Sequence, residues 1–380
     1  MSVNKRVFDT NVQIVKYNVL KEVIRRAYEG GLEDAYLEIP KVICPGPKPQ
    51  IRCCIYKERT IIQDRIKMAM GGDKNNPNPV EVIDIACDEC PAEGVMVTAA
   101  CRGCMVHACL DVCPKGAISI VNHRAVVDKD KCIECGKCSK ACPYSAIIMQ
   151  HRPCMVSCKV KAISIDENKK AKIDNDKCIS CGACVYKCPF GAITDKSYVL
   201  DIIDMLKKSE NNTKYKVYAV IAPAIVSQCR FGRPTQVVTA IQKLGFHQVV
   251  EAALGADITL YNEALEWKEK GLMTTSCCPS YVAFVEKNFP ELVPHISHSV
   301  SPMIMTAQLI KHSDPTAKVI FIGPCASKKF EFKLEKTGGA IDSVMSFEEL
   351  QAFLDAREID TVECEDTALD NASFYGRIFA

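Results

Sequence analysis

Two cysteine runs constrain the fold of this chain more than any other part of its sequence. Each run has four cysteines with the spacing C-x2-C-x2-C-x3-C, and a proline follows the fourth cysteine directly. The runs occupy residues 132–143 and 178–189. No regular helix or strand would point three thiols of such a run at one centre, so the spacing predicts a tight loop wrapped around a metal group.

The spacing is that of the 4Fe-4S loops of bacterial ferredoxins, in which the fourth cysteine ligates a neighbouring cluster. Structural zinc sites, the weaker alternative, usually show paired C-x2-C knuckles and no run of four that ends in proline. An internal repeat supports the iron–sulfur interpretation, because Cys109-x3-Cys113 followed by PKGAI recurs as Cys154-x3-Cys158 followed by KVKAI. The repeat unit of about 45 residues has the size of one supersecondary module.

Cross-ligation between neighbouring runs assigns ligands to three clusters. The first set is Cys101, Cys104, Cys109 and Cys142, the second is Cys113, Cys132, Cys135 and Cys138, and the third is Cys158, Cys178, Cys181 and Cys184. Cys154 and Cys188 then lack two partners, and the pair Cys87 and Cys90 could complete a fourth cluster with them. The alternative, that Cys154 and Cys188 are remnants of a lost cluster, stays open. We therefore expect three to four 4Fe-4S clusters.

The composition is that of a globular protein that works in a reducing compartment. Hydrophobic residues make up 48% and charged residues 25% of the 380 residues, which is ordinary for a soluble chain of two or three domains. The net charge of +2 gives no basis for binding nucleic acid or a membrane surface. The 24 cysteines include several ligand-spaced runs and no secretory signal precedes them, so we expect a cytoplasmic protein without disulfides.

The chain divides by pattern into three regions, and the fold class we expect is α+β. Residues 1–80 read as helical, with helices near 18–29 and 58–70, and the pair Cys53-Cys54 is expected to be buried. Residues 81–196 form the tandem ferredoxin-like region. Residues 197–380 alternate strands and helices, which favours a mainly parallel sheet and places Trp267 in the core. The expected strands are 216–221 and 318–322, and the expected helices are 235–244, 260–269, 281–288 and 302–312.

Two loops of the third region carry cysteines in distinctive motifs. One reads TSCCPS at residues 275–280, and the other reads GPCASKK at 323–329, directly after an expected strand. Parallel sheets place their sites in loops at the carboxyl ends of strands. Both motifs resemble active-site motifs of the iron-only (FeFe) hydrogenases. The chain from residue 87 onward is similar to that family, and within it to a monomeric, ferredoxin-linked subgroup (group B-like).

The resemblance implies an H-cluster, which is a 4Fe-4S cubane joined to a diiron unit with carbonyl, cyanide and dithiolate ligands. It assigns Cys278 and Cys325 as ligands of the cubane, and Cys277 as the thiol that passes protons to the diiron unit. The further positions that it implies are the proton path Glu263, Ser297 and Glu266, the cyanide-binding Lys328, and the backbone around a second cyanide at Pro223 and Ala224.

These residue types suit the chemistry that the resemblance implies. Cleavage of dihydrogen needs a relay of groups that both donate and accept protons, as thiol, hydroxyl and carboxyl groups do. Glu263 and Glu266 are one helical turn apart, which suits such a relay, although a Glu pair at this spacing is more often a solvated helix face. An ammonium such as Lys328 can balance the charge of a cyanide through a charge-assisted hydrogen bond.

The sequence departs from the family at its third motif, a glycine-rich segment with two further cysteines. After Cys325 only Cys364 remains before Ala380, and it stands in an acidic stretch without that motif. Gly323 also occupies a position where many relatives carry methionine. Two thiolates do not hold a cubane securely, so we expect a C-terminally truncated chain in which residues 197–380 form an incomplete catalytic domain.

The function that the resemblance implies is reversible oxidation of dihydrogen and reduction of protons. Ferredoxin or a similar carrier would be the electron partner, and hydrogenase maturation proteins would assemble the site. The alternatives are a non-catalytic homologue, acting as an iron–sulfur assembly factor or a redox sensor, and a polyferredoxin electron carrier. Cys277, Glu263, Ser297 and Glu266 favour the enzyme, because a sensor or a carrier needs no proton path.

Overall fold

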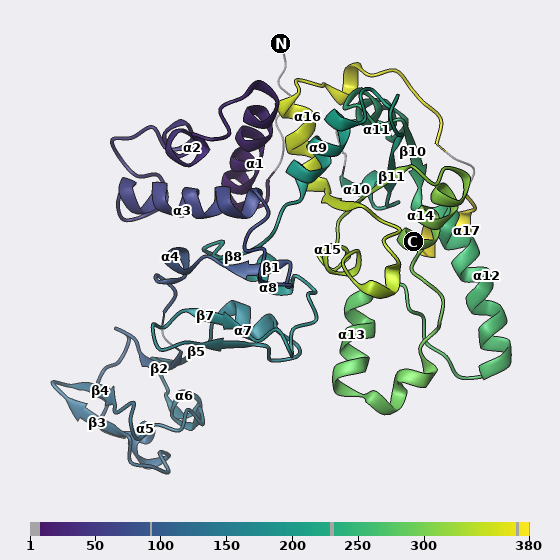
Figure 1. Ribbon diagram of the computed structural model, residues 1–380. Coiled ribbons are helices and arrows are strands. Elements are labelled where there is room, and N and C mark those ends of the chain that lie inside the picture. The colour runs from purple at the N-terminus through teal and green to yellow at the C-terminus, as the bar shows by residue number, and fades with distance from the viewer. Residues whose placement is uncertain (1–7, 92, 229–231, 370–371, 380) are drawn as a thin grey trace.

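The computed structural model describes residues 8–91, 93–228, 232–369 and 372–379. Three N-terminal helices, two small iron–sulfur-type modules and a parallel sheet follow one another along the chain (Figure 1). The N-terminal helices are not a separate body, because one hydrophobic core joins them to both faces of the sheet. No helix in the described ranges has both the length and the apolar character needed to cross a membrane.

The N-terminal helices are α1 (Asn11–Glu29), α2 (Ala35–Ile43) and α3 (Ile55–Ala69). The helices expected at 18–29 and 58–70 are confirmed, and both begin earlier than expected. Helix α2, which contains Pro40, was not expected. The expectation that Cys53-Cys54 is buried was wrong: both are exposed, because Cys54 is the N-cap of α3, where its sulfur accepts a hydrogen bond from the backbone N–H of Lys57 at 3.4 Å.

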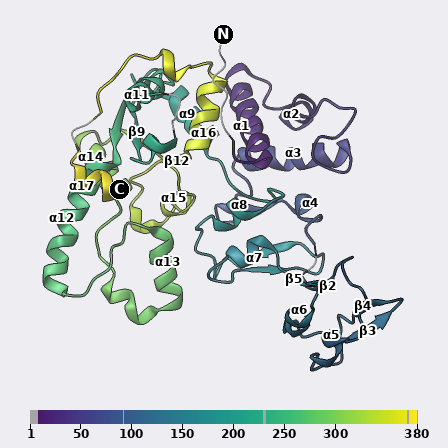
Figure 2. The same ribbon diagram turned by 180° about the vertical axis from the view of Figure 1, so that it is seen from behind.

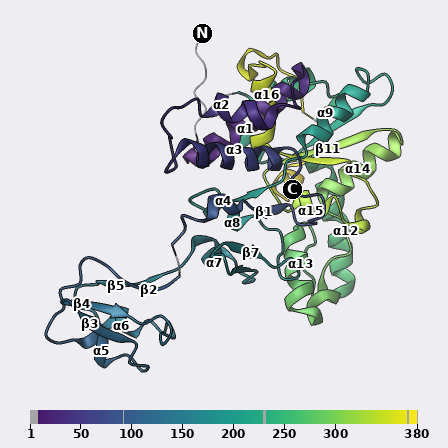
Figure 3. The same ribbon diagram turned by 60° about the vertical axis from the view of Figure 1, so that its left-hand side comes forward.

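One iron–sulfur-type module is inserted into the other. The inner module contains β1 (Val80–Val82), α4 (Asp84–Cys87), α7 (Pro153–Ser157), β6 (Ile163–Ile165), β7 (Ala171–Ile173), α8 (Ala183–Lys187) and β8 (Ile193–Asp195). The outer module contains β2 (Gly94–Val97), α5 (Ala108–Asp111), β3 (Ile118–Val121), β4 (Arg124–Val127), α6 (Lys137–Ala141) and β5 (Ile147–Gln150). The chain leaves the inner module through β2 and returns through its antiparallel partner β5. The outer module therefore projects away from the rest of the molecule (Figure 3).

The third region is built on four parallel strands in the order β10-β9-β11-β12, as the alternating pattern predicted. The strands are β9 (Val217–Ile221), β10 (Gln248–Glu251), β11 (Lys318–Gly323) and β12 (Ser343–Ser346). The helices of this region are α9 (Val199–Lys208), α10 (Ile225–Gln228), α11 (Pro234–Lys243), α12 (Ala252–Lys270), α13 (Pro279–Asn288), α14 (Pro302–Ser313), α15 (Lys328–Glu331), α16 (Phe347–Ala356) and α17 (Phe374–Phe379). Helix α12 extends beyond the sheet (Figure 2), so Trp267 near its end is 60% exposed and the prediction that it belongs to the core was wrong.

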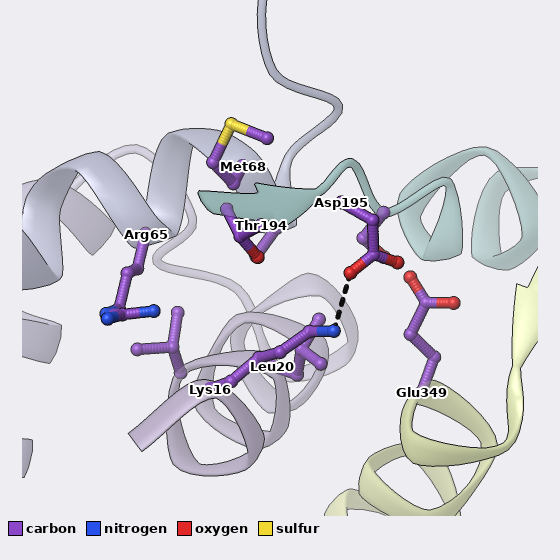
Figure 4. Close-up of a pocket in the computed structure, with 10 residues that line it drawn as sticks. Lys16, Leu20, Arg65, Met68, Thr194, Asp195 and Glu349 are labelled. Carbon is purple, nitrogen blue, oxygen red and sulfur yellow. Dashed lines mark hydrogen bonds and ion pairs between the residues drawn. The ribbon is translucent and has the colours of Figure 1, made fainter. Parts of the chain in front are cut away.

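A buried ionic network joins the three regions at one carboxylate, Asp195, which Figure 4 shows with Lys16 and Glu349. Asp195, at the end of β8, accepts hydrogen bonds from the ammonium of Lys16 on α1 at 2.6 Å and of Lys329 on α15 at 2.7 Å. Lys329 is 1% exposed and also donates to Glu349 on α16 at 2.9 Å. Burial alone would raise the pKa of Asp195, but the two ammonium groups hold that pKa far below its ordinary value. The network fixes the inner module against α15, the helix that also carries Lys328.

Candidate functional site

The outer module contains two pockets, and each pocket is lined by four cysteines. One pocket is lined by Cys101, Cys104, Cys109 and Cys142, and the other by Cys113, Cys132, Cys135 and Cys138. Backbone N–H groups point at the sulfurs, for example from Ala125 to Cys101 at 3.3 Å and from Ala117 to Cys113 at 3.2 Å. These hydrogen bonds lower the pKa of both thiols and so favour the thiolates that ligate iron.

The inner module brings together the four cysteines whose partnership the sequence left open. Cys87, Cys90, Cys154 and Cys188 line one pocket. Burial and then the neighbouring thiols, Cys188 first, raise the pKa of Cys154 to about 11. The four thiols therefore share one pocket and lie near one another. That they hold iron stays a prediction.

The second inner set, Cys158, Cys178, Cys181 and Cys184, also converges. Burial and then the thiols of the other three cysteines raise the pKa of Cys184 to about 12. Helix α7 carries Cys154 and ends immediately before Cys158, so the two inner sets are about one helical turn apart. Among the described residues, no group of three His, Cys, Asp or Glu side chains is placed to hold a single metal ion.

The two cysteine motifs of the third region lie on adjoining loops. The first loop leads into α13, and the second follows β11 and leads into α15. The ammonium of Lys328 donates to the backbone oxygen of Cys277 at 3.0 Å and pairs with Glu331 at 2.7 Å. The hydroxyl oxygens of Ser280 and Ser327 are in contact where the two loops meet. These contacts bring the loop of Cys277 and Cys278 against the loop of Cys325, as the motif pair predicts.

The loop of the second inner set is in direct contact with both motif loops. The hydroxyl of Ser280 donates to the backbone oxygen of Ile179 at 2.9 Å, and the hydroxyl of Ser327 donates to that of Ser180 at 3.0 Å. Both acceptors lie between Cys178 and Cys181. The cysteine set nearest the sheet is thereby fixed against the candidate catalytic loops.

Pro223 and Ala224 follow β9, the neighbour of β11, so they lie at the same edge of the sheet as Cys325. Gly323 closes β11 at this edge. A side chain at this position would meet the ring of Phe321 at 2.5 Å and the methyl of Ala222 at 3.4 Å. The ring of Phe321 therefore fills the space that a side chain at position 323 would occupy in this chain.

The candidate proton path is assembled from α12 and two loops. Glu263 is 4% exposed and accepts a hydrogen bond from the backbone N–H of Ser276 at 3.2 Å. Ser297 donates from its hydroxyl to Glu266 at 2.7 Å. Burial raises the pKa of Glu263, although the hydrogen bond from the backbone N–H of Ser276 opposes this. The structure thus places Glu263 against the loop of Cys277, and Ser297 against Glu266. That these residues form a proton path stays a prediction.

The second carboxylate of this path has the opposite electrostatic environment. Burial would raise its pKa, but hydrogen bonds from Lys270, Ser297 and the backbone N–H of His298 bring the pKa of Glu266 to about 2. A pocket beside the path is lined by Ser276 and Ser297. The pKa of the buried carboxyl Glu263 is thus raised, whereas that of Glu266, nearer the surface, is lowered.

Several residues of these sites were not singled out from the sequence. Lys270 and Glu331 follow Glu266 and Lys328 by four and three residues on their helices, a spacing that could have indicated both ion pairs. Ser280 and Ser327 carry no sequence signal of their contact, because it depends on how two distant loops meet.

Three segments of the chain match known protein families. Residues 215–380 match the family described as iron only hydrogenase large subunit, C-terminal domain. Residues 171–194 match the 4Fe-4S binding domain, and residues 100–146 match the 4Fe-4S dicluster domain. The chain is an iron-only hydrogenase-like protein with 4Fe-4S binding domains.

Iron hydrogenase 1 of Clostridium pasteurianum is 30% identical to this hydrogenase-like chain over 288 residues, which are 68% of this chain and 49% of that protein. The periplasmic [Fe] hydrogenase large subunit of Nitratidesulfovibrio vulgaris is 32% identical over 277 residues, 66% of this chain and 62% of that protein. The chain thus spans less than two thirds of the length of either relative. The cytosolic Fe-S cluster assembly factor NAR1 of Kluyveromyces lactis is 37% identical over 93 residues, 24% of this chain and 20% of that protein.

Among solved structures, an [FeFe]-hydrogenase is similar with a TM-score of 0.42 and 24% identity. The alignment covers 46% of this chain and 51% of that one.

Proposed function

We propose that this chain carries the electron-transfer and catalytic regions of an iron-only hydrogenase, which oxidises dihydrogen and reduces protons reversibly. The observation that carries the proposal is the meeting of two routes at the motif loops. The cysteine set of Cys184 touches these loops through Ser280 and Ser327, and the carboxyl of Glu263 touches them through Ser276. Electrons and protons must both reach the place where dihydrogen is cleaved.

The electron route is a row of four 4Fe-4S clusters, each a one-electron carrier. The outer pockets share helix α5, which carries Cys109 and lies just before Cys113. The pocket of Cys113 is lined by Val95 of β2, the strand that leads to the inner module. The inner pockets share α7 in the same way. We infer that ferredoxin or a similar carrier exchanges electrons at the projecting outer module, and that the protein works in the cytoplasm.

The proton route consists of groups that this chain supplies itself. The thiol of Cys277 is half-buried on the motif loop, and the Glu263 carboxyl is held beside that loop by Ser276. The hydroxyl of Ser297 donates to Glu266 and accepts from the backbone N–H of Ser299. A hydroxyl can both accept and donate a proton, so the proposed route runs from Glu263 through Ser297 to Glu266. Glu266 hands the proton to water because it is ionised and lies near the surface.

The residues fit part of an H-cluster site. Cys278 and Cys325 offer two thiolates from adjoining loops, Lys328 offers an ammonium, and Pro223 and Ala224 offer backbone groups. The family's third motif supplies two further thiolates. That motif does not occur after Cys325 within residues 1–380. When bound, an H-cluster supplies the metal at which dihydrogen is split. We therefore propose a helical region at 1–80, a ferredoxin-like region at 81–196 and a catalytic region at 197–380 that holds only part of the ligand set. Hydrogenase maturation proteins would assemble the site.

The test is hydrogen-dependent reduction of methyl viologen by the protein matured with its full ligand set, together with infrared spectra. We expect turnover and the carbonyl and cyanide bands of an H-cluster. Replacing Cys277→Ala should lower turnover by at least about 100-fold while the bands remain, because a proton-transfer group and not a ligand is removed. Cys53→Ala is the matched control, since Cys53 is exposed at the start of α3 and should leave both readouts unchanged.

A second candidate function is that of an iron–sulfur assembly factor. The similarity to the NAR1 protein of Kluyveromyces lactis favours it, although that match covers only 24% of this chain. Such a protein, or a redox sensor or polyferredoxin, would bind iron and show no carbonyl or cyanide bands. Iron-loaded protein without these bands and without turnover would therefore reject the hydrogenase and leave the cluster sites in place.

A further inference from the structure

The pocket of Cys87, Cys90, Cys154 and Cys188 contains a buried guanidinium. Arg152 lies two residues before Cys154, is 2% exposed and lines this pocket. Its Nη1 donates to the sulfur of Cys87 at 3.7 Å. In the described part of the chain, the other recorded N–H donors to cysteine sulfurs of the four sets are backbone groups, as from Ala171 to Cys87 at 3.4 Å.

The remaining N–H groups of Arg152 are directed at backbone oxygens. Nε donates to Pro91 at 3.2 Å, and Nη2 donates to Lys169 at 2.6 Å and Cys90 at 3.5 Å. The carboxylate of Glu93 is near, but it accepts from the backbone N–H of Arg152 at 3.2 Å. Within the described residues no carboxylate forms an ion pair with this guanidinium. Its hydrogen bonds are satisfied, and its charge is not balanced by protein.

A buried cation without a counter-charge is strongly unfavourable, and arginine cannot lose its proton to avoid the cost. The group that would balance the charge here is a 4Fe-4S cluster with four thiolates, which is an anion that gains a further negative charge on reduction. The orientation of Nη1 toward Cys87 fits this, because hydrogen bonds from cations to anionic acceptors are the stronger ones. A second buried arginine, Arg65 on α3, donates to the backbone oxygen of Phe190, two residues after Cys188.

The outer module offers an internal comparison. His107 stands two residues before Cys109, as Arg152 stands two residues before Cys154, and it lines the corresponding pocket without a permanent charge. Burial is similar at these two corresponding cysteines, since Cys109 is 9% and Cys154 6% exposed. The reduction potential of a 4Fe-4S cluster depends on net charge, hydrogen bonds to sulfur and exposure. Of these three factors, charge and side-chain hydrogen bonding to sulfur distinguish the pocket of Cys154 from the pocket of Cys109.

We propose that Arg152 raises the reduction potential of the cluster at Cys87, Cys90, Cys154 and Cys188, and that this cluster has the highest potential of the four. It is the point along the row where an electron stays longest between the outer module and the motif loops. The inference depends on the proposed fourth cluster and on no step of hydrogen turnover, so cluster potentials test it even in a protein without hydrogenase activity.

The experiment is a redox titration of the iron-loaded full chain, followed by electron paramagnetic resonance of the reduced clusters. Arg152→Met should shift one component at least tenfold toward the oxidised form at a fixed potential, which is about 59 mV for a one-electron couple. Arg152→Lys keeps the charge and should recover most of that shift. Iron content should equal that of the wild type in both variants.

Arg124→Met is the matched control. Arg124 is an exposed arginine on β4, and its charge is among the causes that lower the pKa of Cys101. Its guanidinium donates to the backbone oxygen of Thr98 at 2.9 Å. Water screens the charge of Arg124, so Arg124→Met should shift the titration of each cluster by much less than tenfold. Equal titrations of Arg152→Met and wild type, at equal iron content, would overturn the proposal.

The Met variant has a second informative outcome, which is loss of the cluster. The component that disappears must then be the one that titrates at the highest potential in the wild type. Disappearance of a lower-potential component would contradict the proposal. So would a wild type with only about twelve irons in this region, because the four-iron stoichiometry then leaves no fourth cluster.

Discussion

The outer and inner modules have closely related cysteine spacings and very different surroundings. The outer module projects into solvent, and the loop between Cys104 and Cys109 presents Met105, which is 97% exposed. The inner module is covered by α3 on one side, where Lys57 pairs with Asp88 and Glu89, and by the motif loops on the other.

The comparison separates what holds a cluster from what a cluster does. Backbone N–H groups approach the sulfurs in both modules, because the loop around each cysteine run has the same local geometry. The inner module alone has a buried arginine of its own, Arg152, and contacts from Arg65, Ser280 and Ser327 in other regions. The backbone hydrogen bonds to the sulfurs are therefore a local feature of the loops, whereas potential and position depend on the rest of the fold.

The largest difference is expected when one ligand is removed from each module. Cys184→Ala should remove about four irons and stop viologen-linked turnover, because its cluster is the one that borders the motif loops. Cys109→Ala should remove about as many irons, by the same stoichiometry, yet retain most of the turnover, because a small dye can reach the inner clusters directly. Iron analysis and viologen assays on both variants measure this. Equal loss of turnover in the two would contradict direct entry of electrons from the dye at the inner clusters.

A smaller effect is expected from the contact that fixes the inner module in place. Asp195→Asn leaves Lys16 and Lys329 without their shared carboxylate, and removing one partner of a buried ion pair typically costs about 3–5 kcal/mol. The urea midpoint of the iron-loaded chain measures the loss. Asp204→Asn, which breaks an exposed pair with Lys208, is the control and should not shift the midpoint detectably.

The pH dependence of this effect follows from the lowered pKa of Asp195. A carboxyl whose pKa is lowered on folding stabilises the fold fully above its unfolded pKa, which is about 3.9, and loses that contribution as the pH falls toward the folded pKa. The difference between Asp195→Asn and wild type should therefore be constant from about pH 5 to 8 and should shrink only below about pH 4. A difference that disappears near neutral pH would contradict the assignment.

The sequence predicted the cysteine sets and the parallel sheet because both are encoded in short, regular patterns. Four cysteines in one run fix a loop, and Val217–Ile221 and Lys318–Gly323 are apolar enough to indicate buried strands. The fourth cysteine set was open in the sequence, since Cys87 and Cys90 meet Cys154 and Cys188 only after the whole outer module has been inserted between them.

The sequence did not indicate residues whose role depends on where they are buried. Lys329 looks like one half of a lysine pair at a strand end, and its burial against Asp195 follows from the packing of three regions. Trp267 was wrongly placed in the core, because its size suggests burial while the end of α12 extends beyond the sheet. Arg152 has no motif, and only the pocket around it shows that its charge faces cysteine sulfurs.

The smallest effects are expected in the proton path, and they sharpen the comparison because neither module should respond. Glu263→Gln should lower turnover by about 100-fold, since a buried group in the proton route no longer takes up a proton. Glu266→Gln should lower turnover by only about tenfold, because Glu266 lies near water and its role is to release the proton. This loss is smaller than the rate factor that a general acid or base usually contributes. Glu269→Gln, on the exposed face of the same helix, is the control.

Redox titration of the three variants should give unchanged cluster potentials, since Glu263 and Glu266 make no recorded hydrogen bond to a proposed cluster ligand in the described chain. A shift in any cluster would show that the carboxylates act through the electron route, and the separation of the two routes at the motif loops would then fail.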